Sequence, residues 1–193
     1  ITYTHDQPMS HEPGEKWVYN GGCSMMLSYI LKNATGTEVV DYAKKYLLDP
    51  IGVENWSWTI TNKNVANTST GLSMSRRDMA RFGVLYLNGG RWQGKQIVPQ
   101  DWVRESTSVQ VLGKGDYFPY AYGYHWWRLQ DLEPTVAMLD VNDAYFALGF
   151  GGQFIFIVPH LNLVVVSTAG NFGPDESLFL KLVRDHIFPA VIN

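Results

Sequence analysis

Two apolar, β-branched runs near the C-terminus constrain the fold of this chain more than any other feature. The runs cover 154–158 and 163–168, and Pro159-His160-Leu161-Asn162 lies between them. Valine, isoleucine and phenylalanine favour strands, and a four-residue connection of this composition is typical of a hairpin. The runs therefore predict two antiparallel strands, and the sequence from Ala144 predicts a third strand before them.

The pattern of apolar residues before these strands is helical. Asn20 can cap a helix that ends at Gly36, and its apolar face is expected to be packed. That face consists of Met26, Leu27, Ile30, Leu31 and Ala34. Further helices are predicted from about Thr37 to Asp49 and from Ser75 to Leu87, with an irregular loop over 54–70. A last helix is expected to begin near Asp175 and to end at Pro189.

Helices followed by antiparallel strands and a covering helix predict an α+β fold. Residues 1–110 are expected to form a helical region, and residues 111–193 the strands and the C-terminal helix. Three strands with one covering helix form a small sheet for a chain that is 46% hydrophobic. We therefore expect partner strands to be missing from the N-terminal side.

Composition excludes several classes of partner. The net charge of −3 and the scattered lysines and arginines leave no basic surface for nucleic acid. No window approaches the roughly 18 apolar residues of a membrane span. Cys23 is the single cysteine, which excludes an intrachain disulfide and a thiolate metal cluster, and it is expected to be buried. The five histidines show no metal-ligand spacing, and the glycines at 149–152 do not form a dinucleotide loop, so no metal or cofactor is expected.

One tyrosine stands directly before the first predicted helix. Pro13-Gly14 predicts a turn, Trp17 and Val18 are expected to be half-buried, and Tyr19 precedes the capping residue. Two interpretations remain open. The spacing alone favours a core tyrosine with a satisfied hydroxyl. Alternatively, the positive end of the helix stabilises a phenolate at a ligand site.

Several stretches together resemble the serine hydrolases of the β-lactamase and penicillin-binding-protein superfamily, and among these the esterases and 6-aminohexanoate-dimer hydrolases. The matching stretches are 12–21, 50–53, 71–83, 88–90 and 149–153 with the following hairpin. The resemblance implies a β-lactamase/transpeptidase-like α+β fold, with an antiparallel sheet flanked by helices. It also implies that this chain is the C-terminal part of one such domain.

Three sequence elements carry the chemistry of that superfamily: Ser-x-x-Lys, Tyr-x-Asn and a Lys-Thr-Gly-like strand. Tyr19-Asn20-Gly21 resembles the second, with glycine where an amide is frequent, and Ala147-Leu148-Gly149 resembles the third, with alanine where lysine or histidine is common. The resemblance implies that Tyr19 transfers protons and that these other residues line the site. It also implies that the backbone N–H of Phe150 is one of two oxyanion donors.

The first element is missing, because no serine is followed three residues later by lysine. We expect Ser-x-x-Lys on an N-terminal segment, which is on another chain or lost, and this chain alone to be inactive. Ser73 and Ser75 are poorer nucleophiles, because the pattern around them lacks the last glycine of a nucleophile elbow. Since Ala147 removes a charge that could hold a substrate carboxylate, a neutral ester or amide is favoured over a β-lactam.

Other interpretations stay open. The same fold also serves as a non-catalytic ligand-binding or sensor module, and the chain could equally be an inert fragment. Aromatic residues near the strands could form a half-buried sheet face or wall an acyl pocket. They are Tyr117, Tyr120, Tyr122, Trp126 and Trp127. Relatives are often exported bacterial proteins, although the sequence does not assign the compartment or the oligomeric state.

Overall fold

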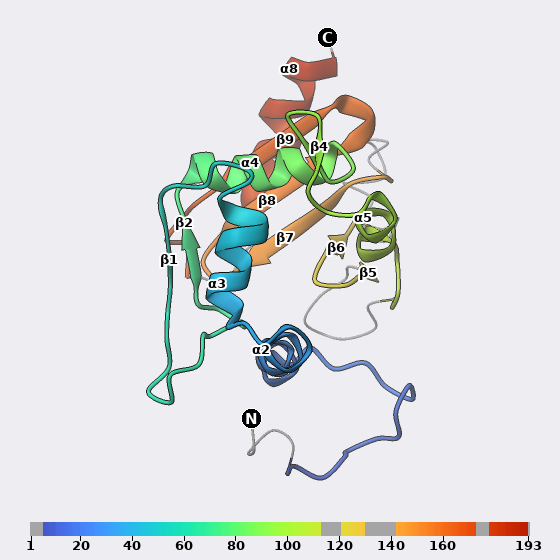
Figure 1. The fold of residues 1–193 in the computed structure, drawn as a ribbon. Coiled ribbons are helices and arrows are strands. Elements are labelled where there is room, and N and C mark those ends of the chain that lie inside the picture. Colours follow the sequence, from blue (N-terminus) through green and yellow to red (C-terminus); the bar gives the residue numbers. More distant parts are fainter. Residues whose placement is uncertain (1–5, 113–120, 130–141, 173–177, 193) are drawn as a thin grey trace. The chain divides into compact units, whose positions relative to one another are not determined.

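The structure is a computed structural model that describes residues 6–112, 121–129, 142–172 and 178–192 (Figure 1). Its contacts divide the chain into two compact units, Ile1–Ser75 and Arg76–Asn193, and each unit is described by itself. Among the described helices, none is long and apolar enough to cross a membrane. The expected division into a helical region and a sheet region at about residue 110 stays a prediction.

The first unit contains the predicted N-terminal helices. Helix α2 spans Gly21–Thr35, and Gly36 ends it with φ of 71°. Helix α3, Val39–Ala43, continues as the π-helical segment η1, Lys44–Leu48. Leu48, at the end of this segment, is buried, and so are Ile51 and Val53 directly after it.

The segment predicted as an irregular loop contains a strand. Strand β1, Trp56–Trp58, pairs antiparallel with β2, Leu72–Met74. The indole N–H of Trp58 donates to the carbonyl of Asn67 at 2.9 Å, which fastens the intervening chain to the ribbon. The sequence analysis missed the strand because three residues are too short to establish a period.

Helix α2 corrects three expectations about burial. Leu27 and Ile30 of the predicted apolar face are exposed, and Ser28 is the buried residue of this helix. The Ser28 hydroxyl donates to the carbonyl of Met25 at 2.8 Å, so its burial leaves no polar atom unsatisfied. Cys23 is exposed rather than buried. Val18, which precedes the helix, is also exposed, whereas half-burial was expected.

The second unit is built on a five-stranded antiparallel sheet in the order β5-β6-β7-β8-β9. Its strands are β5 Ala121–Tyr122, β6 Trp127–Arg128, β7 Tyr145–Gly149, β8 Gln153–Val158 and β9 Leu163–Ser167. Val158 pairs with Leu163, which confirms the hairpin with the four-residue loop. The described aromatic residues Tyr122 and Trp127 lie on β5 and β6.

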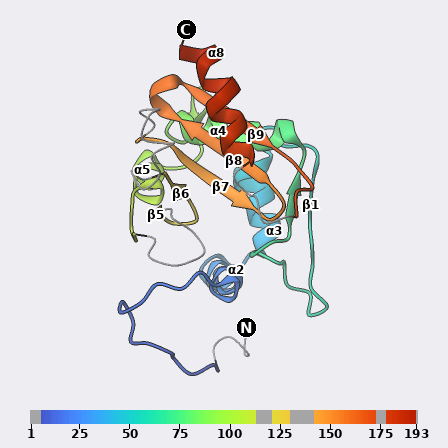
Figure 2. The same ribbon diagram turned by 180° about the vertical axis from the view of Figure 1, so that it is seen from behind.

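Helices cover both faces of this sheet, as Figures 1 and 2 show from opposite sides. Helix α4, Arg76–Leu87, packs on β8 and β9. On the other face, the ring of Phe179 stacks on that of Phe154 with centroids 4.2 Å apart. Because side chains alternate along a strand, Ile155 and Ile157 contact the α4 side while Phe154 and Phe156 contact the C-terminal helices.

The remaining elements of the second unit are short. They are β3 Arg91–Trp92, β4 Lys95–Gln96, α5 Gln100–Thr107, α7 Leu178–Leu182, the π-helical segment η3 Val183–Ile187 and α8 Phe188–Ile192. The prediction that Pro189 ends the last helix is wrong, because α8 runs through it. Pro189 lies in the first turn after a π-helical segment, where a missing N–H is tolerated. The expected start of this helix near Asp175 lies outside the described residues. The α+β class is confirmed.

Candidate active site

Tyr19 lies in the first unit, directly before helix α2. Its side chain is 56% exposed, and its ring centroid is 6.2 Å from that of Trp17. The turn predicted at Pro13-Gly14 is present, since the Glu15 N–H donates to the carbonyl of Glu12 at 3.0 Å. The interpretation of Tyr19 as a core tyrosine is therefore wrong, because more than half of its surface is exposed.

Asn20 holds the start of this helix. Its backbone is extended, and its side-chain oxygen accepts the N–H of Gly22 at 2.7 Å. This is the predicted N-cap, which satisfies one of the helix's unpaired donors. The first turn of α2 carries no acidic residue. The positive end of the helix therefore remains available to an anion near residues 19–22.

Gly21 lies close to the side chain of Ser69. A β-carbon at this position would lie 2.5 Å from the hydroxyl oxygen of Ser69. The turn that carries Ser69 is held by Asn67, whose side-chain oxygen accepts the N–H groups of Ser69 and Thr70, both at 3.1 Å. The Thr68 hydroxyl donates to the carbonyl of Ser24 at 2.8 Å and ties the same turn to α2.

Sequence reasoning missed the turn at 67–70 as part of this surface. The run Asn-Thr-Ser-Thr is typical of a turn in which asparagine bonds its own backbone, so the turn itself could have been found. Its contact with Gly21 joins residues 48 positions apart, and no local pattern predicts such a contact.

The other expected site residues lie in the second unit. Ala147, Leu148 and Gly149 are the last three residues of β7, and Phe150 begins the turn to β8. Ala147 packs against the buried cluster beneath α4. Among the described residues, no backbone hydrogen bond outside helices and strands uses the N–H of Phe150. This donor can accordingly serve a ligand.

Two glycines shape this turn. Gly151 and Gly152 have φ of 80° and 92°, which side-chain-bearing residues rarely adopt. A β-carbon on Gly151 would lie 2.5 Å from the ring of Phe172. The sequence alone did not indicate that Phe172 lies against this turn.

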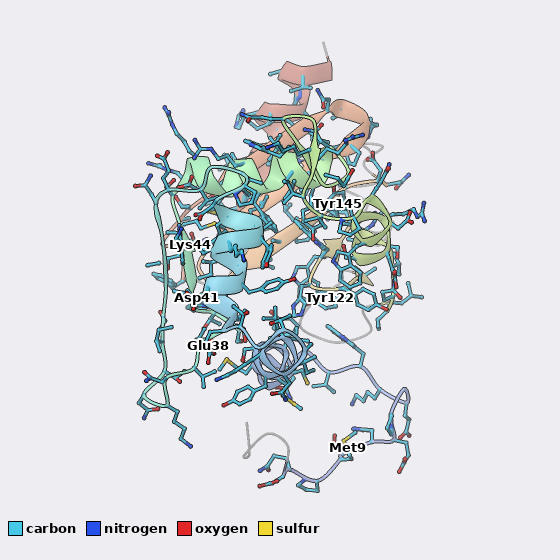
Figure 3. All side chains as sticks on the ribbon, in the orientation of Figure 1. Met9, Glu38, Asp41, Lys44, Tyr122 and Tyr145 are labelled. Carbon is cyan, nitrogen blue, oxygen red and sulfur yellow. The ribbon has the colours of Figure 1, made fainter. Side chains whose placement is uncertain are left out.

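The described members of the aromatic group lie on β5 and β6 or between them. Trp126 and Trp127 are buried. Trp126 stacks parallel to Phe82 and meets the ring of Tyr145 at 90°. Figure 3 labels Tyr145, on β7, and Tyr122, on β5. Burial raises the pKa of the Tyr145 phenol well above its usual range, so this group stays protonated. Tyr117 and Tyr120 lie outside the described residues.

The remaining candidates are placed as follows. Ser73 lies in β2 opposite Ser57, as a strand residue. In the part of the chain that the structure describes, no group of three histidine, cysteine, aspartate or glutamate side chains could hold a metal ion. Tyr19, Asn20 and Gly21 belong to the first unit, and Ala147, Leu148, Gly149 and Phe150 to the second. Each unit thus carries one of the two expected elements, and their assigned roles stay predictions.

Known proteins are similar to this chain in sequence and in fold. The chain is 29% identical over 217 residues to an uncharacterized protein of Alkalihalophilus pseudofirmus, covering 95% of the chain and 63% of that protein. It is 25% identical over 160 residues to the 6-aminohexanoate-dimer hydrolase of Paenarthrobacter ureafaciens, covering 78% of the chain and 38% of that protein. A solved Bacillus anthracis protein, provisionally assigned as a 6-aminohexanoate-dimer hydrolase, is 28% identical with a TM-score of 0.82.

The alignment with the Bacillus anthracis protein covers 96% of this chain and 47% of that one. The chain therefore spans between about one third and two thirds of the length of these relatives. Residues 1–185 match the Beta-lactamase family, which is nearly the whole chain. The family match and the shared fold agree with the resemblance found in the sequence, and the chain belongs to the beta-lactamase family.

Proposed function

We propose that this chain supplies two parts of a serine hydrolase site, a proton-transfer tyrosine and one oxyanion donor. The observation that carries the proposal is the exposed phenol of Tyr19 directly before the capped end of α2. The chain belongs to the beta-lactamase family, and we assign Tyr19-Asn20-Gly21 to the Tyr-x-Asn element, with glycine where an amide is frequent.

The nucleophile belongs to a segment that carries Ser-x-x-Lys and is absent from this sequence. Two features of the chain support such a partner segment. Leu27 and Ile30 leave apolar surface exposed on α2. Strand β9, Leu163–Ser167, lies at one edge of the sheet and contains four apolar residues and a serine. An apolar edge without a charged residue is suited to pairing with a further strand.

The proposed reaction is acyl transfer followed by hydrolysis. The serine oxygen attacks the carbonyl carbon of an ester or amide, and its proton passes to the phenol oxygen of Tyr19, whose own proton passes to the lysine of the Ser-x-x-Lys segment. The carbonyl oxygen becomes an oxyanion, which accepts the N–H of Phe150. Tyr19 then donates a proton to the leaving oxygen or nitrogen as the bond to the carbonyl carbon breaks. In the second half of the reaction, Tyr19 accepts a proton from water, and the water oxygen attacks the acyl carbon. The proton then returns to the serine oxygen as the acyl–serine bond breaks.

The substrate class follows from the side chains at the site. Ala147 offers no charge to a substrate carboxylate, which favours an uncharged substrate. The related Paenarthrobacter ureafaciens protein is named for hydrolysis of 6-aminohexanoate dimer, which contains an amide bond, although that dimer also carries a carboxylate. We place neutral esters or amides ahead of β-lactams. No metal or cofactor is required by this reaction.

The first test is intact mass before and after treatment with a fluorophosphonate probe, which labels activated serines. The probe is applied to this chain and to the full-length protein. An adduct on a Ser-x-x-Lys segment outside this chain is the expected result. An adduct on Ser73 or Ser75 would overturn the assignment of the nucleophile. Absence of any adduct on the full-length protein would favour a non-catalytic ligand-binding module or an inert fragment.

The second test is the Tyr19→Phe variant of the full-length protein. Loss of a general acid–base group is expected to lower kcat/KM for an ester by about 10²-fold or more. Tyr46→Phe is the matched control, because Tyr46 is a comparably exposed tyrosine in the same unit. Turnover of Tyr19→Phe at the level of this control would remove Tyr19 from the mechanism.

A further inference from the structure

Two phenylalanines form an exposed pair at the end of the sheet. Phe150 and Phe172 are 76% and 67% exposed, although their ring centroids lie only 5.3 Å apart. Aromatic rings in contact with each other usually lie in the core or at binding surfaces, since exposing both forfeits the free energy of burial. The pair also lies directly at the turn whose first N–H is the proposed oxyanion donor.

The backbone holds this pair in place before any ligand binds. The N–H of Asn171 donates to the carbonyl of Gly151 at 3.0 Å. The side chain of Gln153 donates to the carbonyl of Ala169 at 2.5 Å and to that of Phe150 at 3.4 Å. Because these bonds join the turn to the segment after β9, less side-chain freedom remains to be lost on binding.

The two described segments that carry the pair contain no charged side chain. Residues 147–153 and 169–172 contain no aspartate, glutamate, lysine, arginine or histidine. A charged group on a ligand would find no opposite charge in either segment, and it would lose hydration on contact with the rings. A hydrocarbon group would gain by leaving water.

We propose that the Phe150–Phe172 pair binds the hydrocarbon part of an acyl group whose carbonyl oxygen accepts the N–H of Phe150. The ring and the N–H belong to one residue, so a carbonyl at hydrogen-bond distance places its substituent close to the ring. The inference rests on the proposed function, and it names the substrate class as esters or amides of apolar acids. Phe172 is then a specificity-determining residue.

The direct test uses ligands that carry the carbonyl but cannot be hydrolysed. Acetone and 2-octanone are titrated into the full-length protein with NMR observation of ring-labelled phenylalanine. Because each buried methylene strengthens binding by roughly threefold to fourfold, 2-octanone is expected to bind at least about tenfold more tightly than acetone and to shift the signals of both rings. A 2-octanone that shifts neither ring would overturn the inference.

Variants of Phe172 sharpen this test. Phe172→Ala is expected to weaken 2-octanone binding by about tenfold, while Phe172→Leu, which keeps an apolar side chain on Gly151, weakens it by about threefold. Unchanged amide signals from β7 and β8 show that the turn survives each substitution. Equal affinity of 2-octanone for Phe172→Ala and the unchanged chain would contradict the proposal.

Hydrolysis by the full-length protein separates this inference from the proposed function. With p-nitrophenyl acetate and octanoate, Phe172→Ala is expected to lower kcat/KM for octanoate about tenfold and for acetate less than twofold, whereas Tyr19→Phe lowers both equally. If neither ester is cleaved although the ketone binds, the hydrolase proposal fails and the binding surface stands. If both esters are cleaved without preference and Phe172→Ala affects them alike, the acyl-binding role of the Phe150–Phe172 pair is wrong, while the hydrolase proposal is supported.

Discussion

Gly83 of helix α4 lies directly against Val164 of strand β9. A β-carbon at position 83 would lie 2.6 Å from a methyl carbon of Val164 and 3.0 Å from one of Ile155. Glycine inside a helix is less favourable than alanine by about 1 kcal/mol. The close approach of helix and sheet therefore requires this glycine at the expense of local helix propensity.

Gly83→Ala is accordingly expected to destabilise the chain. Overpacking against stiff β-branched side chains costs about 1–3 kcal/mol, which exceeds the gain in helix propensity. Urea unfolding measures the change in the free energy of unfolding. The double variant Gly83→Ala/Val164→Ala is the control, since removing the Val164 methyls is expected to relieve the clash and make the two effects non-additive. A stabilised Gly83→Ala variant would show that α4 packs farther from β9.

Asn20→Ala is expected to destabilise helix α2 by about 1 kcal/mol. The substitution removes the side-chain oxygen that accepts the N–H of Gly22 at 2.7 Å. Amide hydrogen exchange of residues 21–25 measures the local opening, and the protection of these amides should fall about fivefold for that loss. Asn20→Ser retains a capping oxygen and should keep most of the protection. Equal protection in Asn20→Ala would mean that the cap contributes little.

Asp78→Asn is expected to lower the free energy of unfolding by about 2–3 kcal/mol. The Asp78 carboxylate is fully buried and accepts the Arg81 guanidinium at 2.5 Å, so the substitution removes a charge-assisted hydrogen bond inside the fold. The matched control is Asp101→Asn, which breaks an i,i+3 pair with Arg104 of the same type at 3.0 Å on the exposed face of α5.

The control is expected to cost at most about 0.5 kcal/mol, because both side chains of the Asp101–Arg104 pair are mostly in water. Thermal and urea unfolding compare the two variants. Similar small losses from both substitutions would show that burial adds nothing to the Asp78–Arg81 interaction.

The raised pKa of the Tyr145 phenol is expected to lower the free energy of unfolding at alkaline pH. Burial, as the main cause, and the neighbouring Tyr86 raise the pKa of the Tyr145 phenol above its ordinary value of about 10. Above about pH 10 the unfolded chain releases this proton while the native chain retains it. The unfolded state then binds fewer protons, so the free energy of unfolding falls as the pH rises.

Urea unfolding at pH 8 and pH 10.5 measures this dependence. Tyr145→Phe is expected to show a smaller decrease between the two pH values than the unchanged chain. Tyr46→Phe serves as the control, because Tyr46 is half-exposed and should leave the decrease as it is. An identical decrease for Tyr145→Phe and the unchanged chain would assign the alkaline loss to other groups.

Local sequence signals predicted the elements whose stability is local. Asn20 and Gly36 bound α2, and the loop 159–162 joins β8 to β9, because caps and turns depend on a few adjacent residues. The continuous apolar run over 154–158 is likewise typical of a strand with both faces covered. The resemblance to a hydrolase superfamily, found from short stretches, agreed with the family match over residues 1–185.

Burial of each helix face was decided by the tertiary structure. Leu27 and Ile30 have the periodicity of a packed face but are exposed, while Ser28 is buried, since periodicity tells which residues share a face and not what covers it. The length of β5 and β6, and the helix that continues through Pro189, also depend on neighbours distant in sequence.

The sequence by itself determined the α+β class, the first helices, the C-terminal hairpin, and the tyrosine and glycines that became candidate site residues. Only the tertiary structure decided that Ser69 lies against Gly21, that Val164 lies against Gly83 and that Phe172 lies against Gly151. Each contact joins residues far apart in the chain, and its geometry arises from packing between elements, which local propensity does not encode.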